Sequence, residues 1–308
     1  FIADWYDKQV NHYRNHEGNI DKKLGRIYRV RKKGAGQSKK FNLRMSDELD
    51  LIGLLSSESR WLRRMALIEL KSRKEFNVKS VQWKDNPKNV SQFEFIKNGN
   101  YLLDIEKIID PGVRGYSIKS IAESSNAFRY FEQIKKISLT EKNPEVISQL
   151  VSSISTLNES IKEQLLENIL LRDEFVEDPF IPLQIWWALE SMVSNDDGFI
   201  RELFTRSSTW NSKIISGFIL ERLMRRYAEE STSKSYSMCE FLLKNANDDN
   251  SKKILLKGFL EGLNGIGYGA LPDGLIEIFE VNKRILPIEL RIRIGDQSVI
   301  EETISQIK

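Results

Sequence analysis

The two histidines of this chain, His12 and His16, come closest in type and spacing to a chemical site. They stand four residues apart in "NHYRNHEG", and Glu17 follows the second one. Two imidazoles and a carboxylate are ligands that zinc accepts when a helix turn holds them on one face. Asn15 and Gly18 favour a loop over a helix at this point. We therefore predict a loop without a metal here.

The single cysteine limits redox chemistry and metal binding. Cys239, in "SMCEFLL", has no partner cysteine and no neighbouring histidine. An internal disulfide, a thiolate zinc cluster and the Cys-x-x-Cys-His attachment of haem c are all excluded within this sequence. The glycine runs "GAGQSKK" and "GLNGIGYGALP" (262–272) resemble phosphate-binding loops only superficially, because neither leads from a strand into a helix as those loops do. We predict a linker and a turn between helices.

The charge balance argues against nucleic acid as a partner. The 308 residues include 47 basic and 44 acidic side chains, which leaves a net charge of only +3. A local cluster of nine basic residues lies between Lys22 and Lys40, and strand alternation would spread it over two faces. A solvated linker is the favoured interpretation. The apolar stretch Phe180–Leu189 is about half the length of a bilayer crossing, so no membrane span is predicted.

The sequence changes its pattern near residue 33. Ala3–Tyr6 and Arg26–Arg31 are short, rich in aromatic and β-branched residues and partly alternating, which predicts two strands. "KKGAGQSKK" follows as a linker, and beyond it the apolar residues recur with the helical period of 3.6. We predict a β segment over 1–32, a linker over 33–45 and a helical domain over 46–308.

The helical domain repeats itself. Apolar helix starts recur at intervals of 33, 35, 33, 40 and 34 residues, at Val113, Val146, Ile181, Ile214, Ile254 and Ile288. One interval accommodates a hairpin of two amphipathic helices, which cannot bury both apolar faces unless it stacks on its neighbours. We predict an α-solenoid of about six or seven helical hairpins. Residues 75–100 are polar and without a helical period, and we interpret them as an irregular insertion.

One repeat carries a recognisable motif. In "DPGVR" the residues Asp110, Pro111, Val113 and Arg114 resemble the HEAT repeat, in which an Asp-Pro turn opens the second helix and an arginine follows a buried valine. The resemblance implies that Asp110 caps the helix and that Arg114 donates hydrogen bonds between repeats. The other units keep the spacing without the arginine, so the architecture is HEAT-like.

Two adjacent tryptophans, Trp186 and Trp187, stand in the apolar helix "DPFIPLQIWWALE". Neighbouring residues on a helix cannot face the same way. One indole is therefore expected to pack in the core, and the other against a neighbouring repeat or a partner surface.

The two parts of the chain together resemble one bacterial arrangement. Phrases similar to "DWYD", "GRIYR", "WLRR", "DPFIPLQIWWALE" and "LRIRIGD" occur in this order in membrane-bound dehydrogenases that resemble sugar dehydrogenases dependent on pyrroloquinoline quinone. In that family a β-propeller precedes HEAT-like repeats, and a c-type cytochrome domain follows. The resemblance implies that residues 1–32 are the last strands of a propeller, that Phe1 is internal to a longer or processed chain, and that His12 and His16 lie in a loop at the propeller face.

The resemblance implies a scaffold rather than a catalyst for these residues. The parent protein would use pyrroloquinoline quinone, calcium and haem c in the periplasm or at the cell surface. This chain would hold the missing propeller and cytochrome domains together without a catalytic, cofactor or metal site of its own. The alternative is an independent α-solenoid adaptor that binds a protein or peptide on its concave face.

Overall fold

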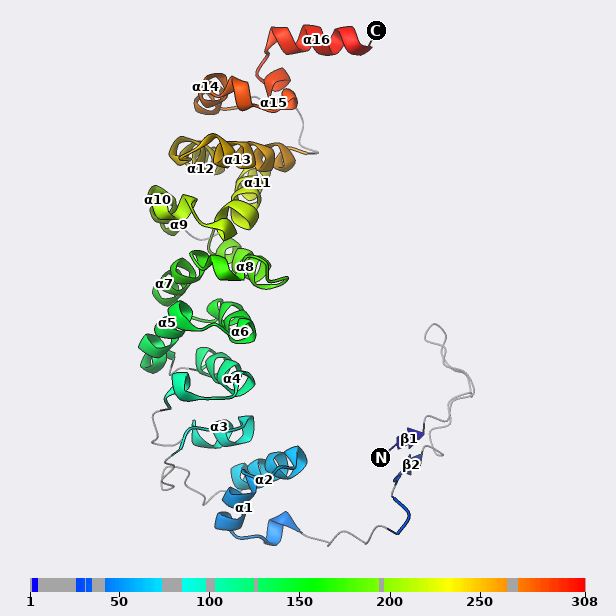
Figure 1. The fold of residues 1–308 in the computed structure, drawn as a ribbon. Coiled ribbons are helices and arrows are strands. Elements are labelled where there is room, and N and C mark those ends of the chain that lie inside the picture. The colour runs from blue at the N-terminus through cyan, green and yellow to red at the C-terminus, as the bar shows by residue number, and fades with distance from the viewer. Residues whose placement is uncertain are drawn as a thin grey trace. The chain divides into compact units, whose positions relative to one another are not determined.

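A computed structural model describes most of the helical region and little of the N-terminal part. The described residues are 2–4, 26–30, 32–34, 42–73, 85–97, 103–124, 127–193, 197–264 and 271–307. Within them the protein is mainly helical, with two short strands near its beginning (Figure 1). Contacts divide the chain into two units, Phe1–Asp47 and Glu48–Lys308.

The first unit contains the two strands. β1 (Ile2–Asp4) and β2 (Arg26–Tyr28) pair antiparallel, with Ile2 opposite Tyr28 and Asp4 opposite Arg26. β1 overlaps the predicted strand Ala3–Tyr6, and β2 covers the first half of the predicted strand Arg26–Arg31. Ile27 is 76% exposed in this unit. A strand pair of this length is marginal in water without further packing.

The second unit consists of helices that pack in pairs and rows. The first row runs through α3 (Val90–Ile96), α4 (Pro111–Ala122), α6 (Pro144–Ile154), α8 (Ile181–Val193), the π-helical segment η6 (Ile215–Ile219) with α11 (Leu220–Glu230), and α13 (Asp249–Gly262). The second row contains α5 (Phe131–Thr140), α7 (Glu159–Leu170), α9 (Gly198–Thr205), α12 (Ser233–Asn245) and α14 (Asp273–Val281). Successive members of the first row touch, as do α5 with α7, α9 with α12 and α12 with α14 (Figure 1).

The remaining helices extend this unit along the sequence. α1 (Glu48–Leu54) packs against α2 (Arg60–Ser72), and α2 packs against α3. α10 (Ser207–Trp210) contacts α9, and α15 (Ile288–Arg293) contacts α16 (Gln297–Ile307). Cross-contacts from α6 to α7 and from α11 to α12 join the two rows. Helices in the middle of this unit thus pack both against sequence neighbours and against the next pair.

The predicted helix starts Val113, Val146, Ile181 and Ile254 fall within helices of the first row, Ile214 directly precedes η6, and Ile288 begins α15. Asn143 and Asp248 are N-caps, whose side chains accept hydrogen bonds from Val146 N at 3.2 Å and Ser251 N at 2.7 Å. Such caps satisfy backbone donors that have no partner inside the helix. The local sequence therefore determines where these helices begin.

The described part of residues 75–100 corrects one prediction. Val90–Ile96 is helix α3, capped by Asn89, whose Oδ1 accepts from Gln92 N at 3.1 Å. Its residues Gln92, Phe93, Phe95 and Ile96 are all buried. The helix packs against α2 and α4. It is only seven residues long and the polar Gln92 lies on its buried side, so the sequence shows too short an apolar stripe to indicate a helix.

Two glycines let α11 and α13 approach closely. A Cβ atom at Gly258 would clash with the carbonyl oxygen of Glu221 and lie 2.9 Å from its carbonyl carbon. At Gly262 it would lie 2.6 Å from the carbonyl oxygen of Arg225 and 2.7 Å from Ala228 Cβ. Gly262, predicted to begin a turn, is instead the last residue of α13. The spacing of four places both glycines on one face, where the helix backbones meet.

Candidate functional site

The predicted repeat motif lies at the beginning of α4. Asp110 Oδ1 accepts a hydrogen bond from Val113 N at 2.8 Å, and Pro111 occupies the first turn, where its missing N–H costs nothing. The Val113 side chain is buried, with 5% exposure. Asp110 is thus the helix cap that the motif predicts.

Arg114 connects α4 to the next helix pair. Its Nε donates to Glu141 Oε2 at 2.6 Å, and its Nη1 donates to the carbonyl oxygens of Ile108 and Ile109, the latter at 3.4 Å. Glu141 in turn accepts from the backbone N–H of Asn143 at 2.8 Å. One arginine therefore joins the segment before its own helix to the turn before α6.

A second arginine, which sequence reasoning missed, continues this connection. Arg172 is only 7% exposed. Its Nη1 donates to the Ser138 carbonyl oxygen at 3.0 Å, its Nη2 donates to the Glu141 carbonyl oxygen, and its Nε donates to Glu174 Oε1 at 2.9 Å. The guanidinium also lies 4.7 Å from the centre of the Phe175 ring. Arg172 belongs to no repeated motif, so the sequence offers no signal for it.

Asp173 extends the polar contacts one pair further. Its Oδ1 accepts from Ser212 Oγ at 3.0 Å and from the backbone nitrogens of Lys213 at 2.7 Å and Ile214 at 3.4 Å. Ser212 Oγ also donates to the Leu170 carbonyl oxygen at 2.7 Å. Together with Arg114, Glu141 and Arg172, these residues form a polar ladder from α4 to η6. Its chemistry is structural, since its groups bind one another.

We expect the Asp110→Ala substitution to lower the free energy of unfolding by about 1 kcal/mol, the usual value of a lost N-cap. Urea denaturation followed by circular dichroism measures it. Asp104 is the matched control, because it precedes a 3₁₀ helix without a side-chain cap bond. Equal effects at both positions would contradict the capping role.

The ladder also predicts a pH dependence. Burial by itself raises the pKa of the Glu141 carboxyl, but hydrogen bonds from Arg114 and from the Asn143 N–H bring this pKa below its ordinary value. A carboxyl with a lowered folded-state pKa stabilises the fold above its unfolded pKa, and this stability disappears as the pH falls through the folded pKa. We therefore expect the stability difference between the wild type and Glu141→Gln to shrink from pH 7 to about pH 3.

Urea titrations at several pH values measure this difference. Glu301→Gln, at an exposed position in α16, is the control and should follow the wild type at every pH. A Glu141→Gln difference that is constant between neutral and acidic pH would refute the assignment.

The two tryptophans of α8 face different surroundings. Trp186 is buried, with 7% exposure, whereas Trp187 is 57% exposed. Trp186 lines a pocket with Glu190 of the same helix and with residues of α11. The exposed indole of Trp187 is large enough to contribute to an interface.

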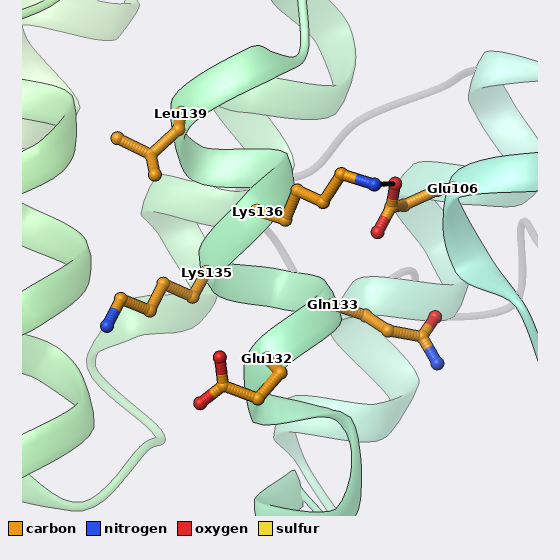
Figure 2. Close-up of a pocket in the computed structure, with 6 residues that line it drawn as sticks. All are labelled: Glu106, Glu132, Gln133, Lys135, Lys136 and Leu139. Atoms are coloured by element: carbon orange, nitrogen blue, oxygen red, sulfur yellow. Dashed lines mark ion pairs between the residues drawn. The ribbon is translucent and has the colours of Figure 1, made fainter.

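A larger, shallow pocket of about 380 Å³ lies beside α5 (Figure 2). It is lined by Glu106, Glu132, Gln133, Lys135, Lys136 and Leu139. Gln133 bonds to the backbone at and before η3 (Ile105–Lys107). Its Oε1 accepts a hydrogen bond from Ile105 N at 2.8 Å, and its Nε2 donates to the Leu103 carbonyl oxygen at 3.0 Å. Figure 2 shows Lys136 pointing to Glu106. Lys136 Nζ lies 2.5 Å from Glu106 Oε2 in this ion pair. These polar groups fasten α5 to its neighbours.

The other predicted positions carry no site within the described residues. His12 and His16 lie outside them. The thiol of Cys239 is fully buried, and burial raises its pKa far above the ordinary value, so it stays protonated. No group of three or more metal-ligating side chains occurs in the described segments. Among the helices described, none is long and apolar enough to cross a membrane.

The fold and these contacts define a mainly helical protein with paired helices and a polar ladder between the pairs. No family model, curated protein or solved structure matches this chain.

Proposed function

We propose that the chain is a HEAT-like α-solenoid of about six or seven hairpins that serves as a scaffold. The packing of its helices in two rows, with the Asp110 cap and the Arg114 bonds between successive pairs, carries this proposal. A unit of two amphipathic helices gains stability by stacking on its neighbours, and the stack presents a long surface for other domains.

The partners proposed for this scaffold come from the sequence resemblance to sugar dehydrogenases dependent on pyrroloquinoline quinone. The strand pair β1 and β2 would end a propeller, and the helical unit would link that propeller to a c-type cytochrome in the periplasm or at the cell surface. Quinone, calcium and haem c would then belong to the adjoining domains. The polar groups described above are occupied with one another, which suits a structural role.

The second candidate is an independent adaptor with a protein or peptide partner. The 57% exposure of Trp187 favours a binding surface of this kind. The reading frame around these 308 codons separates the two candidates. Propeller repeats upstream and a Cys-x-x-Cys-His motif downstream would support the redox scaffold. A start codon near Phe1 and a stop codon after Lys308 would rule out the redox scaffold and favour the adaptor.

We expect the chain alone to perform no redox chemistry. Incubation with calcium and pyrroloquinoline quinone, followed by assay of sugars with an artificial electron acceptor, should give no dye reduction above a protein-free control. The reason is that a quinone site needs walls from several propeller blades, which one strand pair does not supply. A known quinone-dependent dehydrogenase serves as the positive control. Sugar-dependent dye reduction by the purified chain would overturn the scaffold role.

A further inference from the structure

A small polar pocket lies where α8 meets α11. Its volume is about 210 Å³, and its lining residues are Trp186, Glu190, Arg222, Arg225, Arg226 and Glu229. Sites for drug-sized ligands are usually larger than about 300 Å³. The pocket therefore suits a single side chain of a partner better than a cofactor.

The charges around the pocket leave one arginine uncommitted. Arg225 Nε lies 2.9 Å from Glu229 Oε1, and Arg226 pairs with Glu230 at 2.7 Å and lies 3.9 Å from Glu190. Arg222 differs, because its Nη1 donates to the Phe218 carbonyl oxygen at 3.0 Å and no carboxylate of the described residues lies within 4.0 Å of it. A guanidinium has five N–H donors. Most of those on Arg222 remain available to a ligand.

Aromatic side chains border this arginine. The Phe218 ring centre lies 5.9 Å from Arg222 Cζ, and Trp186 forms part of the pocket wall. Trp187 is 57% exposed and directly follows Trp186 in α8, next to the pocket wall in sequence. Arginine and tryptophan side chains are enriched among the residues that dominate binding energy at protein interfaces.

The backbone beside the pocket is also unusual. η6 is π-helical over Ile215–Ile219 and leads directly into α11. A π-helical turn is rare and is found frequently at functional sites. Here it contains Phe218, whose carbonyl oxygen holds Arg222.

We propose that this pocket binds a glutamate or aspartate side chain from an extended acidic segment of a partner protein. Arg222 donates two hydrogen bonds to the carboxylate, in the forked geometry that guanidinium and carboxylate groups share. An apolar residue beside that acid lies on Trp187. Glu190 and Glu229 offset two of the three arginine charges that line the pocket, which suits one carboxylate better than a continuous phosphate backbone. The proposal deepens the scaffold role and rests on it, since it supplies the chemistry of one docking contact.

Fluorescence anisotropy with the full chain tests the proposal. The probes are three labelled 12-residue peptides of alternating acidic and phenylalanine residues, in which the acidic positions hold Glu, Gln or Lys, and a labelled 12-nucleotide oligothymidine. We expect the Glu peptide to bind about tenfold more tightly than the Gln peptide, as the loss of a charged hydrogen bond implies. Arg222→Gln should weaken the Glu peptide about tenfold, and Arg222→Lys by less, because lysine keeps the charge but lacks the fork.

Two further variants complete the experiment. Trp187→Ala should weaken the Glu peptide severalfold. Arg284→Gln is the control. Arg284 is highly exposed and forms an ion pair of 2.7 Å with Asp249, and neither residue lines the pocket. Circular dichroism verifies that each variant is folded.

Several outcomes would overturn the proposal: equal affinity for the Glu and Gln peptides, absence of peptide binding, tighter binding of the oligonucleotide, or indifference to Arg222→Gln. None of them alters the reading-frame test of the scaffold role, so failure of the pocket and failure of the scaffold can be told apart.

Discussion

Substituting alanine for Gly258 is expected to lower the free energy of unfolding by about 3 kcal/mol, the upper part of the range for overpacked sites. The added methyl group would overlap the carbonyl oxygen of Glu221 and lie 3.0 Å from its Cα. Backbone atoms cannot rotate away as the end of a flexible side chain can. α11 and α13 must therefore separate, and the apolar contacts between them weaken. Urea denaturation at neutral pH, followed by circular dichroism, measures the change.

Gly53 provides a matched control for this substitution. It also lies in a helix, α1, and a Cβ atom there would meet nothing within 4 Å. Alanine has the higher helix propensity by about 1 kcal/mol, so Gly53→Ala should be neutral or slightly stabilising. If Gly258→Ala behaved like Gly53→Ala, the close approach of α11 and α13 would be wrong.

Replacing Arg172 with methionine is expected to cost about 3 kcal/mol, because two carbonyl oxygens lose their buried donor at once. One of them, on Ser138, lies in the last turn of α5, where backbone carbonyls have no partner inside the helix. The positive charge of Arg172 also interacts favourably with the negative, C-terminal end of the α5 helix dipole. Methionine fills a similar volume, so the loss would arise mainly from the missing hydrogen bonds.

Arg284→Met is the control for this second substitution. Arg284 is 87% exposed and its ion pair with Asp249 is a surface pair, which is typically worth less than about 1 kcal/mol. Arg172→Lys should fall between the two, since one ammonium cannot reach all the acceptors that the guanidinium serves. Equal destabilisation by Arg172→Met and Arg284→Met would contradict a structural role for the buried arginine.

Most of the helices could be predicted from the sequence because their causes are local. Asp110 and Asn143 are capping residues followed by proline, and each is bonded to the backbone N–H three positions later. α3 escaped prediction for a physical reason. The helix has only seven residues, and the polar Gln92 is buried beside Phe93, Phe95 and Ile96, which shortens the apolar stripe that indicates a helix.

The candidate site was predictable only in part. "DPGVR" predicted that Arg114 would bond between repeats. The adjacent Trp186 and Trp187 predicted that one indole packs in the core, which Trp186 does, and that the other lies against a neighbouring repeat or a partner surface. The partner of Arg114 could not be foreseen, because Glu141 lies 27 residues later and in no motif. Arg222, with spare donors, could not be told from Arg225 and Arg226, since the sequence does not show which arginine meets a carboxylate.

The sequence by itself determined the pattern of strands and helices, the capping residues and the interval at which helix pairs recur, because hydrogen bonds and side-chain periodicity act over a few residues. Only the tertiary structure decided which groups are buried and which are paired. Arg172 meets Ser138 from 34 residues away, and Gly258 meets Glu221 from 37. Contacts of this range depend on how neighbouring helix pairs pack, and packing is set jointly by many side chains rather than by any one of them.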